Sequence, residues 1–139
     1  MFQRISQVLK LPASRAKTIA LLGLAVFFIN LGIDHFVNPD FYLNIMPSYL
    51  PLHLEAVYIS GFCEIVGGVC VLIPRLRSAA GWGLVALLIA VYPANIYMAL
   101  NPELFPDIAL SLLYIRLPMQ FIFIYWAYSV TRPSVLISA

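Results

Sequence analysis

Charged side chains are scarce in this sequence. Only 10% of its 139 residues are Asp, Glu, Lys or Arg, whereas 63% are hydrophobic. A soluble domain of this size needs a charged surface, so the composition excludes that class of protein. The net charge of +2 is too small to indicate a nucleic-acid partner. The composition therefore predicts a single-domain integral membrane protein whose main partner is the lipid bilayer.

Cysteine and histidine are also rare, with two residues of each. On one helix, Cys63 and Cys70 would lie roughly 10 Å apart along the axis. A disulfide needs alpha carbons within about 7 Å, so these two cannot bridge each other. The sequence holds no dithiol motif or other self-contained catalytic motif, which disfavours a thiol oxidoreductase. His35 has no cysteine near it in the sequence, and the other histidine, His53, lies in a predicted loop. A set of metal ligands is therefore not complete around His35, and no metal is expected.

Long apolar runs are abundant. Four of them, at about residues 18–37, 55–73, 79–100 and 107–130, are long enough as helices to cross roughly 30 Å of hydrocarbon. Turn-forming residues separate the runs, namely Asn38-Pro39-Asp40, Pro74 and Asn101-Pro102. The pattern predicts an all-α membrane protein, a four-helix transmembrane bundle over residues 18–130. Residues 1–17 form a basic arm typical of an uncleaved signal anchor, and residues 131–139 form a tail.

Positive charge predicts the orientation of this bundle. Seven basic residues fall on one side of a four-span topology: Arg4, Lys10, Arg15, Lys17, Arg75, Arg77 and Arg132. Cytoplasmic loops carry an excess of Lys and Arg, so we expect that side, with both termini, to face the cytoplasm. Asp40, Glu103 and Asp107 fall on the outer side. The expected location is a bacterial inner membrane.

The first outer loop, VNPDFYLNIMPSYLPLH, is long, apolar and rich in proline. Asn38 is expected to cap a short helix whose first residue is Pro39. Such a helix would lie as a short interfacial segment between the first two spans. Two interpretations stay open, a lid over the outer mouth of the bundle and a linker that packs on the helix ends.

One carboxylate, Glu64, lies in the middle of the second apolar run. A charge at the centre of a bilayer costs about 2.5–3.5 kcal/mol even on lenient scales, so such groups usually face inward and pair. Counting the helical rise places Glu64 and Arg116 both roughly 13 Å from the outer ends of their helices. We therefore predict a Glu64–Arg116 ion pair, with a functional and a structural role both open.

Other polar residues fall on compatible faces of their own predicted helices. Helical spacing aligns Asn30 with Asp34, and Tyr92 with Asn95. The second run also carries small residues on both sides of Glu64, namely Ser60, Gly61, Gly67 and Gly68. Such a stripe of small residues allows helices to pack closely. The clustering predicts a buried pocket in the outer half. Its expected ligand-binding residues are His35, Glu64, Asn95, Arg116, Gln120, Asp34 and Tyr92.

Pro93 and Pro118 lie inside predicted helices and leave the carbonyls of Ile89 and Tyr114 without their usual partners. Those carbonyls need partners inside the bundle. Kinks at the two prolines would widen the bundle beside Asn95, or would serve packing alone.

The chain resembles the DoxX-like family of small four-span membrane proteins over about residues 20–130. The matching stretches are GIDHFVNPDFYLNIMPSYLP, SGFCEIVGGVCVLIPRLRSAAGWGL, VYPANIYMAL and IRLPMQFIFIYWAY. The resemblance matches the family's recurrent polar and proline positions to His35, Glu64, Pro93, Asn95, Arg116, Pro118 and Gln120. It implies a membrane location and a link to quinone-dependent redox pathways, with some relatives in membrane complexes or acting as assembly chaperones.

Three functions follow as hypotheses. The first is a pocket for a lipophilic, quinone-like ligand in a membrane redox pathway. The second is a non-enzymatic assembly or accessory subunit of a membrane complex, with the polar cluster holding the bundle together. The third is a small proton-coupled transporter, which the strong charge bias and the lack of an inverted repeat disfavour. The glycine-rich faces fit packing within one chain or between chains, so a homo-oligomer stays open.

Overall fold

The protein is all-helical over the part of the chain that its structure, a computed structural model, describes: residues 11–12 and 14–133. The predicted basic residues Arg4 and Lys10 lie outside the described residues. Six helices follow one another along the chain: α2 (Arg15–Val37), α3 (Pro39–Asn44), α4 (His53–Cys70), α5 (Arg77–Leu100), the 3-10 helix η1 (Pro102–Leu104) and α6 (Leu110–Thr131).

Each predicted apolar run forms a long helix, and two of the predicted boundaries shift. The second helix ends at Cys70 because residues 71–76 form turns. The last helix begins at Leu110, since a turn closed by the Ile108 amide and the Phe105 carbonyl precedes it. Among the described residues, α2, α5 and α6 are long and apolar enough to cross a membrane. The shorter α4, which carries Glu55 and Glu64, is not among these three.

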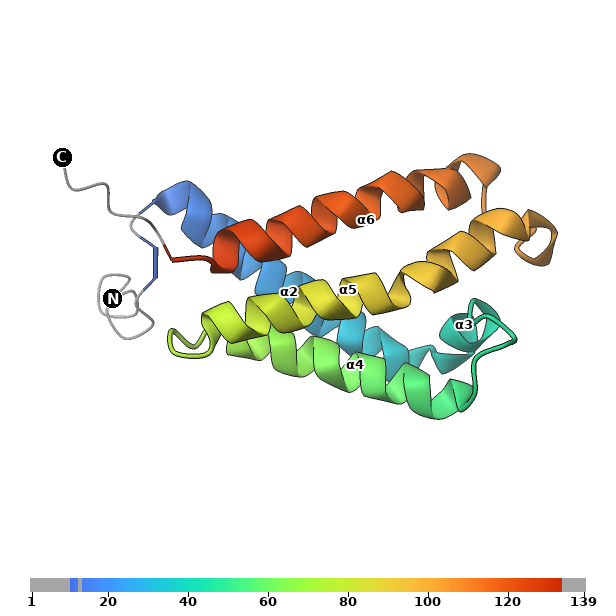
Figure 1. The fold of residues 1–139 in the computed structure, drawn as a ribbon, viewed down its shortest axis with the longest axis horizontal. Coiled ribbons are helices and arrows are strands. Elements are labelled where there is room, and N and C mark those ends of the chain that lie inside the picture. Colours follow the sequence, from blue (N-terminus) through green and yellow to red (C-terminus); the bar gives the residue numbers. More distant parts are fainter. Residues whose placement is uncertain (1–10, 13, 134–139) are drawn as a thin grey trace.

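The long helices form two closely packed pairs, α2 with α4 and α5 with α6 (Figure 1). The start of α2 and the end of α6 lie at the same end of the molecule. There the Lys17 ammonium donates to the carbonyl of Arg132 at 2.8 Å, and Arg132 donates to the carbonyl of Ser78 at 2.6 Å. We call this the basic end, because the described basic residues other than Arg116 lie there: Arg15, Lys17, Arg75, Arg77 and Arg132.

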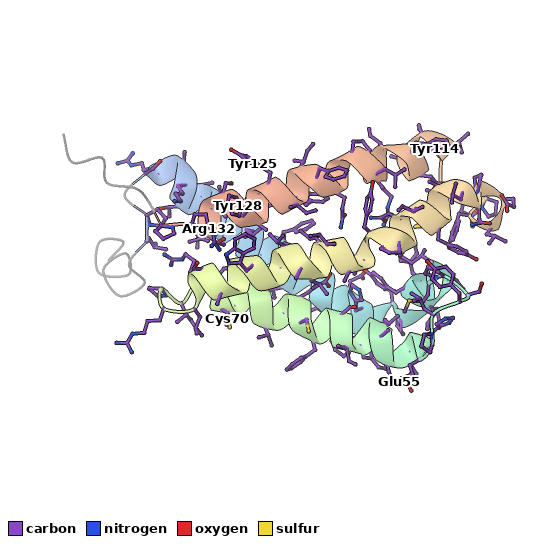
Figure 2. The ribbon with its side chains drawn as sticks, in the orientation of Figure 1. Glu55, Cys70, Tyr114, Tyr125, Tyr128 and Arg132 are labelled. Atoms are coloured by element: carbon purple, nitrogen blue, oxygen red, sulfur yellow. The ribbon has the colours of Figure 1, made fainter. Side chains whose placement is uncertain are left out.

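The opposite end, here called the α3 end, holds the short helix between α2 and α4 (Figure 1). Figure 2 shows Glu55 at this end of α4 and Cys70 at the basic end. Pro39 is the first residue of α3 and Asn38 its N-cap, as predicted. The Asn38 side chain does not cap the helix, however, and donates to Asp34 Oδ1 at 2.5 Å. The link between α2 and α3 is thus held by a side-chain bond.

Two apolar clusters fill the interior. The larger one lies toward the basic end, and its members with no exposed surface include Leu21, Leu24 and Phe28. The smaller one lies toward the α3 end and joins Ile45, Met98, Phe105 and Leu113. Both clusters contribute walls to a cavity, which is described below. Apolar burial of this kind, rather than the sparse polar contacts, accounts for most of the interior.

Glycines bring α2 and α4 into backbone contact. A Cβ added to Gly61 would lie 2.6 Å from the Cβ of His35 and 2.9 Å from the carbonyl oxygen of Gly32. A Cβ on Gly68 would lie 3.0 Å from the carbonyl oxygen of Ala25. The predicted small-residue stripe is therefore confirmed as a close-packing face at Gly61 and Gly68. Gly67 lies on another side of α4, against Leu84 of α5.

We expect Gly61→Ala to lower the stability of the folded chain by about 1–3 kcal/mol, because the new methyl group must push α2 and α4 apart. Gly83→Ala is the matched control, since nothing lies within 4 Å of a Cβ at Gly83. The control should unfold at or slightly above the wild-type temperature, as alanine favours helix over glycine by about 1 kcal/mol. Thermal unfolding in detergent, followed by circular dichroism, compares the three. Equal losses in both variants would contradict the close approach.

Candidate functional site

A cavity of about 390 Å³ lies between the two helix pairs, and its walls come from α2, the segment from α3 to α4, α4, α5 and α6. Most of the lining is apolar. Its polar and ionisable side chains are His35, Tyr42, Ser60, Glu64, Asn95, Arg116 and Gln120. Five predicted site residues thus line one cavity: His35, Glu64, Asn95, Arg116 and Gln120. A volume of this size is in the range of small-molecule binding pockets.

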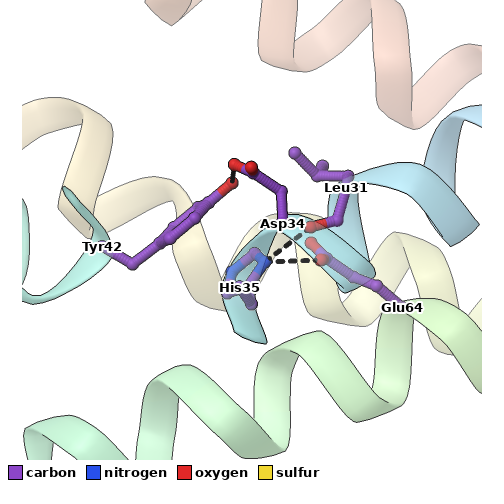
Figure 3. Close-up of polar contacts among 5 residues, drawn as sticks. All are labelled: Leu31, Asp34, His35, Tyr42 and Glu64. Atoms are coloured by element: carbon purple, nitrogen blue, oxygen red, sulfur yellow. Dashed lines mark hydrogen bonds and ion pairs between the residues drawn. The ribbon is translucent and has the colours of Figure 1, made fainter. Parts of the chain in front are cut away.

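On the α2–α4 side, Glu64 meets His35. The imidazole Nδ1 lies 3.1 Å from Glu64 Oε2 and 2.9 Å from the carbonyl oxygen of Leu31 (Figure 3). A carbonyl only accepts hydrogen bonds, so Nδ1 must carry a hydrogen. Both oxygens compete for that single N–H. The close approach of the two helices at Gly61 sets this geometry, because it places the His35 Cβ directly against α4.

Glu64 is the most deeply buried charged side chain in this wall, with 4% of the residue exposed. Among the described residues, its Oε2 is approached by His35 Nδ1 in the ion-pair contact and has no other partner. A carboxylate offers about four acceptor sites, and here it shares part of one N–H. Leaving a buried acceptor unpaired is costly, so this group favours any donor that enters the cavity.

Tyr42 of α3 covers His35 from the α3 end. The two rings stack with centroids 3.7 Å apart, and the tyrosine hydroxyl donates to Asp34 Oδ2 at 2.6 Å (Figure 3). Burial, and then the hydrogen bond to Asp34, raise the pKa of Tyr42, so the phenol keeps its proton and remains a donor. The sequence analysis did not select Tyr42 as a site residue, because its role depends on α3 folding back over α2.

On the α5–α6 side, amides form a chain of hydrogen bonds in one direction. Arg116 Nε donates to Asn95 Oδ1 at 3.2 Å, and Asn95 Nδ2 donates to Gln120 Oε1 at 3.3 Å. Gln120 Nε2 then donates to the carbonyl of Leu88 at 2.6 Å. The chain orients both amides. It engages Arg116 through Nε alone, and within the described chain no hydrogen bond uses its two terminal nitrogens.

The predicted Glu64–Arg116 ion pair is wrong. Within the described part of the chain, the ion pair of Glu64 is with His35, and Arg116 bonds to Asn95. The depths of the two residues agree, but α4 packs chiefly on α2 and α6 on α5. The two charges therefore face the same cavity from different helix pairs, each held by a partner on its own side.

Three other polar residues lie outside the cavity wall. Asp34 is on the side of α2 that faces α3, where it accepts from Tyr42 and Asn38. The ring of Tyr92 packs edge-on against Phe121 at 5.6 Å, between α5 and α6. Asn30 is exposed and donates to the carbonyl of Val26 at 2.8 Å. Helical spacing aligned Asn30 with Asp34 and Tyr92 with Asn95, and of these four side chains Asn95 alone lies in the cavity wall.

Pro93 and its surroundings fit the expected kink. The ribbon of α5 bends in the part that holds Pro93 (Figure 1), and Pro93 itself lines the cavity. The side chain of Gln120 donates to the carbonyl of Leu88 from across the bundle. This carbonyl is one residue before that of Ile89, which was expected to need a partner. Gln120 thus bonds to a backbone carbonyl beside the bend.

No group of three or more His, Cys, Asp and Glu side chains in the described ranges is arranged to hold a metal ion. Cys63 and Cys70 are both free. The cavity itself presents hydrogen-bonding and charged side chains at fixed positions within a mainly apolar lining. That arrangement can bind and orient a small molecule.

We expect Tyr42→Phe to destabilise the α3 segment by about 1 kcal/mol, because it removes the hydroxyl bond to Asp34 and keeps the ring on His35. Tyr49→Phe is the control, since Tyr49 is 74% exposed. Limited proteolysis of residues 38–52 should be faster in the first variant alone. Identical digestion of both variants would show that the hydroxyl does not hold α3.

A family model described as a domain of unknown function, DUF8561, matches residues 24–131. The matched range contains every polar residue of the cavity wall. No curated protein and no solved structure matches the chain.

Proposed function

The chain belongs to the DUF8561 family, and we propose that it is an integral membrane protein whose cavity binds a small lipophilic ligand with polar oxygens, such as a quinone-like molecule. One observation carries the proposal. Glu64 and Arg116 border a mainly apolar cavity of about 390 Å³, and each has hydrogen-bonding capacity that its own side of the bundle leaves unused. A ligand would satisfy both.

In this proposal Arg116, held by Asn95 and Gln120, binds a ligand oxygen. Glu64 and His35 face the other end of the ligand, and Tyr42 closes the cavity toward the α3 end. An apolar lining would bury the ligand's hydrocarbon body, which favours binding by roughly 25 cal/mol per Å² of apolar surface. The resemblance to the DoxX-like family supports the further proposal that the ligand belongs to a redox pathway of a bacterial inner membrane.

We further propose that α4 crosses the bilayer with α2, α5 and α6, which gives four spans and cytoplasmic termini. The side of α4 that faces away from the bundle is apolar and exposed, as lipid contact requires: Ile59, Phe62, Val66 and Val69. Glu64 faces inward instead. The basic end would then lie in the cytoplasm, in keeping with the positive-inside rule.

The crossing of α4 is tested by single cysteines placed before and after it. Ser48→Cys and Arg75→Cys, each made with Cys63→Ala and Cys70→Ala, mark its two ends. A maleimide that cannot cross membranes should label Ser48→Cys on intact cells and Arg75→Cys only after permeabilisation. Labelling of both positions from one side would show that α4 does not span.

Ligand binding is tested by native mass spectrometry of the protein released from its own membranes in mild detergent. We expect a bound small molecule on the wild type and its loss in Arg116→Ala, since the guanidinium would hold the ligand oxygen. Arg75→Ala is the control, because Arg75 is an exposed basic residue at the opposite end of the bundle. Circular dichroism checks the folding of both variants.

A bare wild-type chain would contradict this proposal. Protein partners in place of a small molecule would favour the alternative of an accessory subunit, with the polar groups serving to hold the helices together.

A further inference from the structure

The two polar walls of the cavity have opposite hydrogen-bonding character. The α2–α4 wall presents the carboxylate of Glu64, which accepts, and the α5–α6 wall presents the guanidinium of Arg116, which only donates. We infer that the cavity selects lipophilic molecules with a hydroxyl or N–H donor at one end and a carbonyl acceptor at the other. This inference rests on the proposed ligand-binding function and specifies the class of its ligand.

The accepting wall follows from the Glu64–His35 contact. Nδ1 has one hydrogen, which lies between the Leu31 carbonyl oxygen at 2.9 Å and Glu64 Oε2 at 3.1 Å. The carboxylate thus receives at most part of one N–H, although the Glu64 side chain is only 5% exposed and borders the cavity. A donor from the ligand would add a further hydrogen bond to this carboxylate, whereas a ligand oxygen without a hydrogen would face a negative charge and be repelled.

The donating wall follows from the amide chain. Asn95 and Gln120 each use their amide nitrogen and oxygen within the chain that leads from Arg116 to the Leu88 carbonyl. Their orientation therefore cannot reverse without breaking these bonds. Arg116 has five N–H donors and uses one of them on Asn95, so its free donors suit an acceptor.

An accepting wall opposite a donating wall should distinguish the oxidised form of a quinone from its reduced form. A quinone carries two acceptors, and its hydroquinone form carries hydroxyl groups. The oxidised form would satisfy Arg116 alone, while the reduced form would also donate to Glu64. Of such a pair, the cavity should therefore hold the reduced member more tightly.

The test uses two probes that differ at the para oxygen, which carries a hydrogen in para-hydroxyphenyl hexyl ketone and a methyl group in its para-methoxy ether. Both offer a carbonyl to Arg116, and only the first offers a hydrogen to Glu64. Their dissociation constants are measured by isothermal titration calorimetry on the full chain in detergent. We expect the wild type to bind the hydroxyl probe at least tenfold more tightly, which corresponds to about 1.4 kcal/mol.

Glu64→Gln should reduce this preference to below about threefold, because an amide oxygen is a weaker acceptor than a carboxylate. Glu55→Gln is the control and should keep the preference, since Glu55 is exposed in the first turn of α4 at the α3 end (Figure 2). The wild-type comparison stands without either variant, so a folding defect in Glu64→Gln does not decide the outcome.

Equal affinity for the two probes in the wild type, or a preference for the ether, would overturn the inference and leave ligand binding intact. A preference that survives in Glu64→Gln would also overturn it, because the acceptor would then be another group. Binding of neither probe would count against the proposed function itself.

Discussion

The close approach of α2 and α4 is the constraint on which the rest of the site depends. Gly32 and Gly61 place the two backbones so near each other that a single methyl group would collide with a carbonyl oxygen and with His35. This contact brings His35 to the buried carboxylate of Glu64 at 3.1 Å. Because α4 packs chiefly against α2, Glu64 does not reach Arg116 of α6. The space between the two helix pairs remains as a cavity.

The buried polar groups of the two helix pairs differ in how many of their hydrogen bonds are made within the protein. The α5–α6 pair links Arg116, Asn95 and Gln120 into a chain that ends on a backbone carbonyl near the bend at Pro93. The α2–α4 pair leaves Glu64 with half of one N–H. A low-dielectric surrounding strengthens every hydrogen bond that is made and raises the cost of each one that is missing. The cavity is therefore preorganised on one side and unsatisfied on the other, so a ligand bound as we propose would take a defined orientation.

The apolar outer faces complete this arrangement. Large hydrophobic residues of α4 and α6 are exposed along the outside, among them Phe62, Phe121 and Ile122. Polar groups at mid-depth of the helices lie instead around the cavity or pair locally with the backbone. Lipid would cover the outer faces without competing for hydrogen bonds, so the polar contacts inside would keep their full strength. The basic and α3 ends differ in charge, and this difference supports the orientation that we propose.

Much of the fold was predictable from the sequence. Apolar length and turn residues located the helices, small residues marked the packing face of α4, and depth and helical spacing selected five residues of the cavity wall. The tertiary structure decided which residues Glu64 and Arg116 contact. It also decided that Asp34 and Tyr92 lie outside the cavity wall and that Tyr42 forms part of it. Counting along a helix determines the height and the relative face of a residue. It does not determine which neighbour that face meets, because this depends on how the helices pack and on where a loop folds back.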